Sequence, residues 1–440
     1  MRHVQRPAKP QPVAYWNHLL SVAAGAFTAP TFVLFQKLVW AWIMYPGRHT
    51  VTHLIDPEDG HAHDAYHRLL RAGVWSLESL WRVVLLQSVV TLLPHGGIVR
   101  LALDDTLFHK TGPKVNGAGI FRDAVRSTMN KVVYARGLNA VVLALLVQPP
   151  WGGEPLALPI SYRLHRKDAA RTYVELAEDM LREVARWLPE KYRFKLVCDG
   201  AYSSLAGVDL PRCHVTSRMR RDAALYEPAP AREPGRRGRP RKKGERLPTP
   251  QQMAAHASQQ DWKLTRVSLR GKLVQRLLLC RTVLWYENCP WRLLQLVIVR
   301  DPQGKEQDDF FFTTDLAAKP EDVVSEYAER WAIEDTFRNT KQFLRGEDPQ
   351  CWKHHGPERV VGLSFWIYSL VWLWYLQVWG DKPSWTSMPW YPNKRTPSFK
   401  DALAVLRTAL WQHRILAKSG QRPHMPKIVE LLIRALARAA

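Results

Sequence analysis

The chain has 440 residues and 46% of them are apolar, which is enough to bury a large core and excludes an intrinsically disordered protein. The 63 Lys and Arg residues outnumber the 40 Asp and Glu residues, so the formal net charge is +23. This excess predicts a polyanionic partner, either nucleic acid or an anionic membrane surface, and does not by itself indicate catalysis. The five cysteines show no CxxC spacing, which argues against a zinc site or a disulfide framework and fits a reducing cytoplasm.

The first part of the chain is predicted to be helical and the second to form a sheet. Apolar runs with helical spacing fill residues 13–94, so we expect a helical domain over residues 1–96. From Ile98 onward, short apolar runs typical of buried strands predict an α/β layer with a mixed sheet over residues 97–220. The expected strands are residues 98–104, 137–148, 154–164, 192–199 and 213–219, with an amphipathic helix over 168–188.

Residues 221–312 interrupt this α/β pattern and predict an insertion domain. It starts with residues 227–250, which are rich in Pro, Gly and Arg and predict a flexible basic loop. Strand patterns follow, with expected turns at Arg270-Gly271, Asn288-Pro290 and Pro302-Gly304. The pattern therefore indicates a β-rich unit placed before the next helix.

The basic loop contains a candidate DNA-binding segment with three arginines, Arg237, Arg239 and Arg241. Its Arg-Gly-Arg-Pro sequence, residues 237–240, resembles the core of an AT-hook, whose arginines enter the narrow minor groove of A·T-rich DNA. A basic loop that touches phosphates without sequence preference is the simpler interpretation, and we favour it slightly. Both interpretations predict DNA binding.

A helix is predicted to begin at Pro320 and end at Gly346. The residues that share one face of it are Val323, Tyr327, Arg330, Glu334, Phe337, Lys341 and Leu344. The apolar members of this face predict that it packs inward, although three members are charged. An Arg330–Glu334 ion pair on a solvated face explains the charges in one way. A cluster shared with acids elsewhere in the chain explains them in another.

Two such acids stand at the ends of predicted buried strands, Asp104 after residues 98–103 and Asp199 after residues 192–198. The carboxyl ends of strands are where α/β proteins place their sites. Together with Glu334 these acids predict a cluster of oxygens that repels itself unless divalent cations such as Mg²⁺ or Mn²⁺ bind it. Asp105 competes with Asp104, and because strand residues alternate between faces, only one of the two can point at the ions.

Through these residues, the sequence resembles the DDE transposases of bacterial insertion sequences. The most specific match is Tyr327-x2-Arg330-x3-Glu334-x6-Lys341, the Y-R-E-K pattern of a cut-and-paste group. The stretches "LDDT" around the first acid and "CDGAYSS" around the second are also similar to that group. The likeness covers roughly residues 98–376 and rests on the order of strands and helices together with these motifs.

The resemblance implies an RNase-H-like catalytic core, made of residues 97–220 and 313–380, that cuts and joins phosphodiester bonds with two Mg²⁺ ions, or Mn²⁺ in their place. Asp104, Asp199 and Glu334 would bind the metal ions. Arg330 and Lys341 would hold phosphates, and Tyr327 would contact DNA, although core packing explains Tyr327 equally well. Trp285 and Trp291 are candidates to stack on an extruded base, and structural roles are the simpler interpretation of both. His109 and Lys110 are candidate phosphate neighbours.

The resemblance also implies partners: double-stranded DNA with terminal inverted repeats, target DNA, and a second copy of the chain that holds the other end. It implies that residues 1–96 bind the DNA ends, while residues 381–440 are a C-terminal helical region. A nucleoid-associated cytoplasmic protein is expected. Two alternatives stay open, an RNase-H-like nuclease without strand transfer and a non-catalytic DNA-binding derivative.

One long apolar segment, residues 360–380, contains no charge and is long enough to span a bilayer. Its serines, tyrosine and glutamine are tolerable in a protein core, and no second stretch of that length occurs. We therefore predict a buried core helix and no membrane span.

Overall fold

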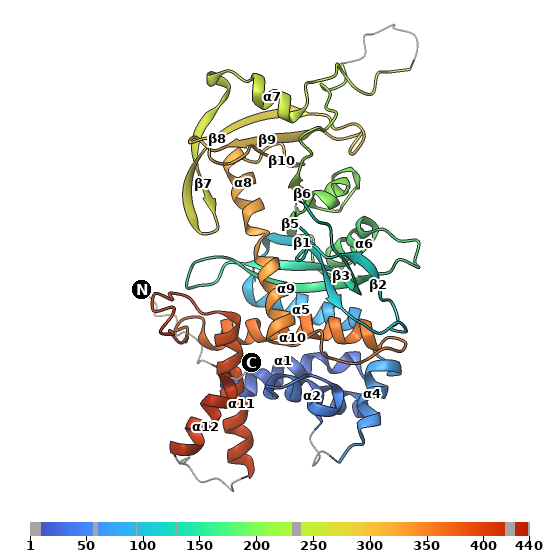
Figure 1. The fold of residues 1–440 in the computed structure, drawn as a ribbon, viewed down its shortest axis with the longest axis vertical. Coiled ribbons are helices and arrows are strands. Elements are labelled where there is room, and N and C mark those ends of the chain that lie inside the picture. Colours follow the sequence, from blue (N-terminus) through green and yellow to red (C-terminus); the bar gives the residue numbers. More distant parts are fainter. Residues whose placement is uncertain are drawn as a thin grey trace.

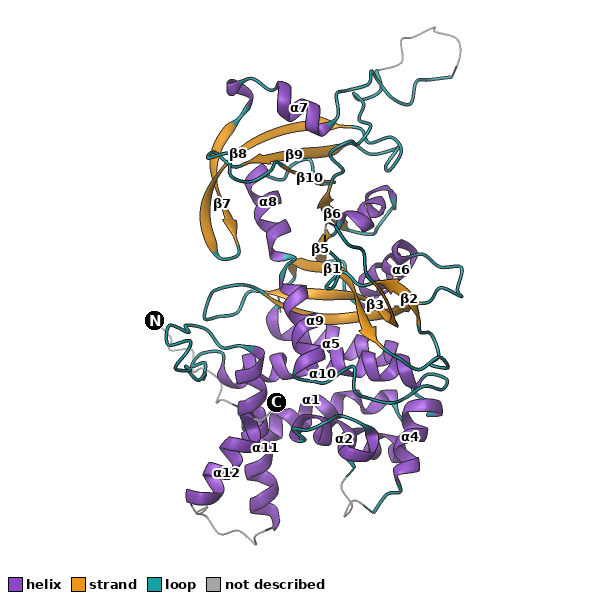
Figure 2. Cartoon of the chain, in the orientation of Figure 1, coloured by secondary structure: helices purple, strands orange, loops and turns teal. Residues whose placement is uncertain are grey.

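The computed structural model describes residues 10–55, 60–93, 95–128, 130–230, 239–418 and 427–438. Along the long axis of Figure 1, the strands of the insertion lie at the top, the core sheet lies in the middle and most helices lie at the bottom. Figure 2 shows the same division by secondary structure. The predicted α/β class, with a mixed sheet and flanking helices, is confirmed.

The helices and strands follow the order expected from the sequence, except for three short elements that were not expected, at residues 119–122, 250–256 and 259–261. The helices are α1 (Pro12–Ser21), η1 (Val22–Ala26), α2 (Ala29–Met44), α3 (Val51–Leu54), α4 (His63–Ala72), α5 (Leu77–Leu92), α6 (Tyr173–Trp187), η3 (Gly200–Gly207), α7 (Pro250–His256), η4 (Gln259–Asp261), α8 (Pro320–Glu329), α9 (Ala332–Gln342), α10 (Gly356–Trp379), α11 (Phe399–Lys418) and α12 (Lys427–Arg438). The strands are β1 (Gly97–His109), β2 (Gly119–Arg122), β3 (Tyr134–Val147), β4 (Leu156–His165), β5 (Tyr192–Cys198), β6 (Cys213–Arg218), β7 (Lys263–Leu269), β8 (Lys272–Val283), β9 (Leu294–Arg300) and β10 (Asp309–Thr313).

The core sheet is mixed. Strand β1 pairs antiparallel with β3 on one side and parallel with β5 on the other, and β5 pairs parallel with β6. Strand β4 pairs with β3, so the five long strands lie in the order β4-β3-β1-β5-β6. Strand β1 is thus central, and β1 and β5 end at the same edge of the sheet.

The insertion extends this sheet. Strand β10 pairs antiparallel with β6, and β9, β8 and β7 follow in that order, so the described strands form one ten-stranded sheet. Two smaller apolar clusters support the added strands and are separate from the main core. The predicted bounds of the insertion, residues 221 and 312, remain a prediction. The strands of the insertion are continuous with the core sheet.

One hydrophobic core joins the N-terminal helices to the core sheet and to α10 and α11. Trp16, Trp42, Leu103, Trp366 and Leu406 are all buried members of it. The predicted boundaries at residues 96 and 380 therefore do not separate independent hydrophobic cores. Helices α1–α5 and α11 pack into the same core as the sheet.

Helix α10 is the predicted buried helix. In the described part of the chain it is the one helix long and apolar enough to cross a bilayer, and 94% of its most apolar window is buried inside the protein. Both serines are hydrogen-bonded, since Ser364 donates to the Val361 carbonyl within α10 and Ser369 donates to the Pro159 carbonyl of β4, each at 2.7 Å. Helix α10 is thus the centre of the helical layer.

The single helix predicted from Pro320 to Gly346 is wrong in one respect. The chain breaks it at Arg330 and Trp331 into α8 and α9, and short hydrogen bonds between residues three apart, such as Arg330 N–H to the Tyr327 carbonyl at 3.1 Å, tighten the junction. Helix α8 packs on the insertion strands, whereas α9 packs on the main core. One straight helix cannot follow both surfaces, so the bend falls between them.

A buried arginine fastens α10 to the segment between α4 and α5. The Arg359 guanidinium donates to four backbone carbonyls, those of Leu69, Leu70, Gly73 and Trp75, at 2.6–3.2 Å. The same guanidinium lies 4.2 Å from the centre of the Trp75 ring. These carbonyls lie where α4 ends, and helix ends need such partners.

The change Arg359→Leu removes all four donors and leaves buried carbonyls unpaired. The free energy of unfolding should fall by about 3 kcal/mol, measured by denaturant unfolding. Arg338→Leu is the matched control, because the Arg338 side chain is 58% exposed and pairs with Asp335 on the surface. The control should change stability by less than about 1 kcal/mol, and an equal loss in both variants would contradict a fastening role.

Candidate active site

Asp104 and Asp199 lie side by side at the edge of the core sheet. In the parallel pair of β1 and β5, Leu103 is the partner of Cys198, so the two acids occupy the next positions of neighbouring strands. Asp199 has extended backbone angles and precedes η3. The structure thus brings the first two predicted acids together through strand register alone.

Asp104 and Asp105 lie on opposite faces of β1. Asp104 forms a salt bridge with Arg330 at the α8–α9 junction, and its Oδ1 accepts the Asp105 backbone N–H at 2.9 Å. Asp105 points the other way, where it accepts hydrogen bonds from the Tyr202 hydroxyl at 3.0 Å and from the Asn139 amide at 3.2 Å. Only Asp104 therefore shares a face with the helix that carries Glu334.

The Arg330 guanidinium lies among the three acids. Its Nη1 binds Asp104, and its Nη2 lies 3.5 Å from the Glu334 Oε1. The negative charge of Asp199 is also close enough to raise the pKa of Arg330, and it acts with Asp104 and Glu334 against the effect of burial. The local Arg330–Glu334 pair expected on a solvated face is thus the longer of the two contacts, and the charged face of the helix points at the sheet edge.

Burial raises the pKa of Asp104 and of Glu334. The pKa of Asp104 rises to about 7, chiefly because burial outweighs the effect of Arg330, and the charges of Asp105 and Asp199 add to the shift. Burial also raises the pKa of Glu334, against the opposing effects of Arg330 and Arg270. Burial thus disfavours the charged forms of Asp104 and Glu334 more strongly than Arg330 favours them.

This donor set suits a hard divalent cation in its chemistry. All three side chains offer carboxylate oxygens, which Mg²⁺ and Mn²⁺ prefer. Within the described ranges, no group of three His, Cys, Asp or Glu side chains is already drawn together closely enough to hold an ion. In this structure the positive charge beside Asp104 and Glu334 comes from Arg330.

Lys341 binds the strand and not the glutamate. Its ammonium donates to the Thr106 hydroxyl at 2.8 Å and to the Leu107 carbonyl at 2.7 Å, and it lies 5.2 Å from the centre of the Phe108 ring. Lys341 thus fastens α9 to the part of β1 that follows Asp104, on the same face of the strand.

Tyr327 is largely a packing residue. It is 9% exposed, and its ring centre lies 4.5 Å from that of Phe311 on β10 and 5.7 Å from the Arg330 guanidinium carbon. Burial raises its pKa to about 12, so its hydroxyl stays neutral near pH 7. Of the two interpretations offered by the sequence, core packing describes its position.

His109 and Lys110 already have protein partners. The His109 ring lies between Asp123, at 2.8 Å from Nε2, and Glu347, at 3.0 Å from Nδ1. The Lys110 ammonium donates to the carbonyls of Glu347 at 2.6 Å and Pro349 at 3.0 Å. These contacts hold the end of β1 against the chain after α9, so neither side chain is presented to a phosphate.

The basic loop lies beyond the insertion strands in Figure 1. Arg237 lies outside the described residues, whereas Arg239 and Arg241 are exposed. The base of the loop is held in place, because the Lys243 ammonium lies 3.8 Å from the Tyr226 ring centre and 4.9 Å from that of Tyr286. The predicted flexibility therefore does not extend to this end of the loop.

The two candidate stacking tryptophans differ. Trp285 is 6% exposed and packs edge-on against Phe312 at 5.7 Å between ring centres, so it is a core residue. Trp291 is 53% exposed, and its indole N–H donates to the Gly207 carbonyl at 2.9 Å. The Trp291 ring is thus the more exposed of the two, although the Arg292 guanidinium carbon lies 4.3 Å from its centre.

Two residues of the site have no motif signal in the sequence. Trp331 occupies the α8–α9 junction, and Arg270 occupies the turn between β7 and β8, 61 positions earlier in the chain. The Arg270 guanidinium carbon lies 4.1 Å from the Trp331 ring centre. The sequence predicted the turn at Arg270-Gly271, but not where the turn would lie.

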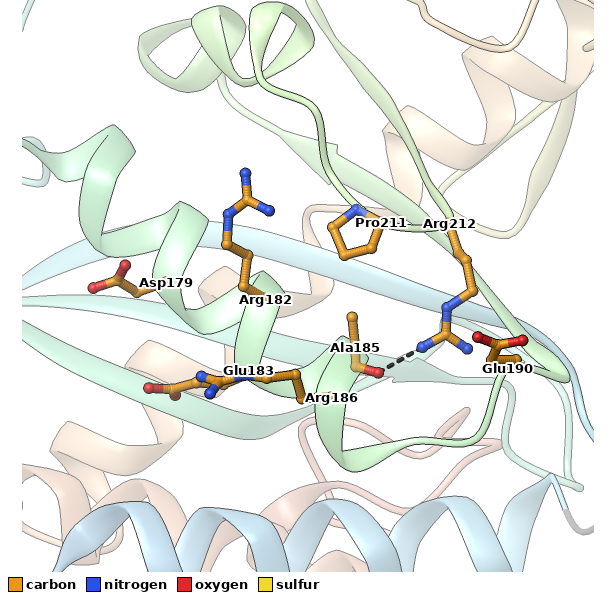
Figure 3. A pocket seen from close by; sticks show the side chains of 8 residues that line it. All are labelled: Asp179, Arg182, Glu183, Ala185, Arg186, Glu190, Pro211 and Arg212. Carbon is orange, nitrogen blue, oxygen red and sulfur yellow. Dashed lines mark hydrogen bonds between the residues drawn. The ribbon is translucent and has the colours of Figure 1, made fainter.

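A surface hollow of about 550 Å³ lies elsewhere, beside α6 and the start of β6 (Figure 3). One of the residues that line it, Arg212, donates to the Ala185 carbonyl at 2.5 Å and to three further carbonyls near the end of α6. None of the predicted site residues lines it. This hollow is explained by the capping of α6.

The sequence matches a family of known proteins. A family model described as "DDE superfamily endonuclease" matches residues 27–276, which include Asp104 and Asp199 and end before Glu334. No curated protein matches. Among solved structures, a piggyBac transposase synaptic complex with hairpin DNA is similar at a TM-score of 0.40 and 12% identity, over 96% of this chain and 81% of that one. The family match covers more than half of the chain, which therefore belongs to the DDE superfamily of endonucleases.

Proposed function

We propose that the chain is a DNA transposase that cuts and joins phosphodiester bonds at the ends of an insertion sequence. The observation that carries the proposal is the convergence of Asp104, Asp199 and Glu334 on the guanidinium of Arg330. Phosphodiester chemistry with divalent ions needs such a set of oxygen donors, and a net charge of +23 attracts DNA. Membership of a superfamily of endonucleases supports the same reaction class.

In this proposal the three carboxylates hold two divalent ions, Mg²⁺ with Mn²⁺ as a substitute. When bound, such ions activate an attacking oxygen and stabilise a leaving oxygen at phosphorus. The attacking oxygen belongs to water when the DNA is cut and to a DNA 3′-hydroxyl when it is joined. Asp104 then no longer depends on Arg330, whose guanidinium becomes available to a DNA phosphate.

The remaining residues of the pattern position the reacting groups. Lys341 keeps the end of β1 in place through Thr106 and Leu107, and thereby the Asp104 carboxylate two residues earlier. Tyr327 packs beside Arg330 and presents a neutral hydroxyl. We further propose that α1–α5 bind the terminal inverted repeats and that two copies of the chain hold two ends.

The changes Asp104→Asn, Asp199→Asn and Glu334→Gln keep side-chain shape and remove charge. Each should lower cleavage of DNA carrying the element's ends by about 10²-fold or more, with DNA binding largely retained. The measurement is gel mapping of products formed with Mg²⁺. Asp105→Asn is the matched variant on the opposite face of β1 and should retain more activity than Asp104→Asn. The reverse order would show that Asp105 is the first acid.

The same assay separates the alternatives. Joined products require a transposase, whereas cleavage without joining indicates a nuclease. A folded wild-type protein that binds the ends and never cuts them is a non-catalytic derivative.

Lys341→Met retains the stem over Phe108 and removes both hydrogen bonds to β1. The free energy of unfolding should fall by about 1–3 kcal/mol, and turnover per folded molecule should fall by about 10²-fold, since Asp104 is displaced. Unfolding curves and active-fraction kinetics measure the two effects. Lys400→Met is a control, because the Lys400 ammonium also lies near a phenylalanine ring, 5.7 Å from the centre of Phe343. A loss of stability with unchanged turnover would make Lys341 purely structural.

The exposed arginines of the basic loop are expected to contact DNA phosphates. Replacing Arg239 and Arg241 with Ala should reduce the slope of log affinity against log salt by up to about 0.9 for each lost contact. A double change of Arg182 and Arg186 to Ala removes the same charge from α6 and should leave the slope unchanged. An unchanged slope in the loop variant would mean that the loop faces away from DNA.

A further inference from the structure

The turn between β7 and β8 has an unusual residue in it. The two strands are joined by Arg270 and Gly271, whose φ angles are 49° and 70°. Positive φ at both central residues is the geometry of a tight hairpin turn, where Asn, Asp or Gly is the usual first residue. An arginine in this left-handed conformation is strained, because its Cβ atom crowds the following carbonyl oxygen. Backbone strain of this kind is often found at functional sites.

The turn lies against the core beside the candidate active site. The Arg270 guanidinium stacks on Trp331, which is 42% exposed and lies between Arg330 and α9. On the other side of the turn, a Cβ atom on Gly271 would lie 3.5 Å from the Glu154 Oε1, in the loop between β3 and β4. In Figure 1 the β7–β8 hairpin curves down beside α8 towards this loop. The insertion thus returns to the core at the point where α8 meets α9.

Arg270 also adds positive charge to the site. Burial raises the pKa of Glu154, and the charge of Arg270 opposes this shift. It is exposed, and its planar guanidinium rests on an aromatic face. That arrangement holds the group in one orientation and leaves its N–H edges available for a bidentate acceptor such as phosphate.

We propose that Arg270 binds a backbone phosphate of the DNA strand held at the candidate active site, with Trp331 as the platform that orients its guanidinium. The proposal rests on DNA being the substrate of the Asp104–Asp199–Glu334 cluster. The insertion would then contribute a phosphate-binding group to the site as well as surface for the DNA end.

The test uses Arg270→Asn in the full-length protein. Asn adopts the left-handed conformation readily, so the variant should melt at the wild-type temperature or above it. Binding to duplex DNA carrying an end of the element is measured across salt concentrations without divalent metal. The slope of log affinity against log salt should fall by about 0.9, and cleavage with Mg²⁺ should fall by about 10²-fold.

Arg266→Gln is the matched control, since Arg266 is an exposed residue of β7 four positions before the turn. Equal loss of slope in both variants would overturn the proposal, because net charge alone would explain it. An unchanged slope and rate in Arg270→Asn would overturn it as well.

Changing the platform gives a second readout. Trp331→Leu should lower cleavage, and the double variant with Arg270→Asn should be no slower than Arg270→Asn alone, because the two residues act as one unit. Additive losses would overturn the role of Trp331. If the wild-type protein binds the ends and never cuts them, the proposed function fails, while the slope still decides whether Arg270 contacts phosphate.

Discussion

The contact on which the site depends is that of the Arg330 guanidinium with buried carboxylates. Asp104 is 17% exposed at its side chain and Arg330 is 11% exposed, so neither charge is well solvated. Burial and neighbouring acids raise the pKa of Asp104 to about 7 even with Arg330 beside it. Buried carboxyl groups with shifted pKa values beside an arginine mark a candidate functional site. The same arginine occupies the helix junction, so charge and backbone geometry are linked there.

The bend between α8 and α9 arises because the two helices pack on two different apolar cores. Val323 and Tyr327 pack with the insertion strands, while Ile333 and Phe337 pack with the main core. Because β10 pairs with β6, the insertion is held in a defined position on the core sheet. The β7–β8 turn can therefore place a side chain beside Trp331, although β7 is the farthest strand from β1 on that side of the sheet. Sheet continuity is what makes a remote turn part of the site.

Two neighbouring residues of β1 show how strand alternation separates roles. Asp104 faces α9 and the cluster, whereas Asp105 is held on the other face by Tyr202 and Asn139. Tyr202 belongs to η3, directly after Asp199. The hydrogen bond between Tyr202 and Asp105 thus ties the turn that carries the second acid to the strand that carries the first. Both acids of the "DD" pair contribute to the geometry, in different ways.

The sequence by itself determined most of the order of strands and helices, the buried position of α10, and the position of Asp199 directly after a strand. These features follow from periodicity and from residue types within short segments, which act locally. The prediction that Asp104 ends its strand is wrong, because β1 pairs with β3 as far as His109. Asp104 instead lies one position beyond the residue of β1 that pairs with the end of β5. Only the tertiary structure decided that the helix carrying Glu334 bends at Arg330, that Lys341 binds β1, and that the insertion strands continue the core sheet. The contact of Arg270 with Trp331 belongs to the same group. Each of these features depends on contacts between segments that are distant in the chain. The local pattern of residues does not show which segments will meet.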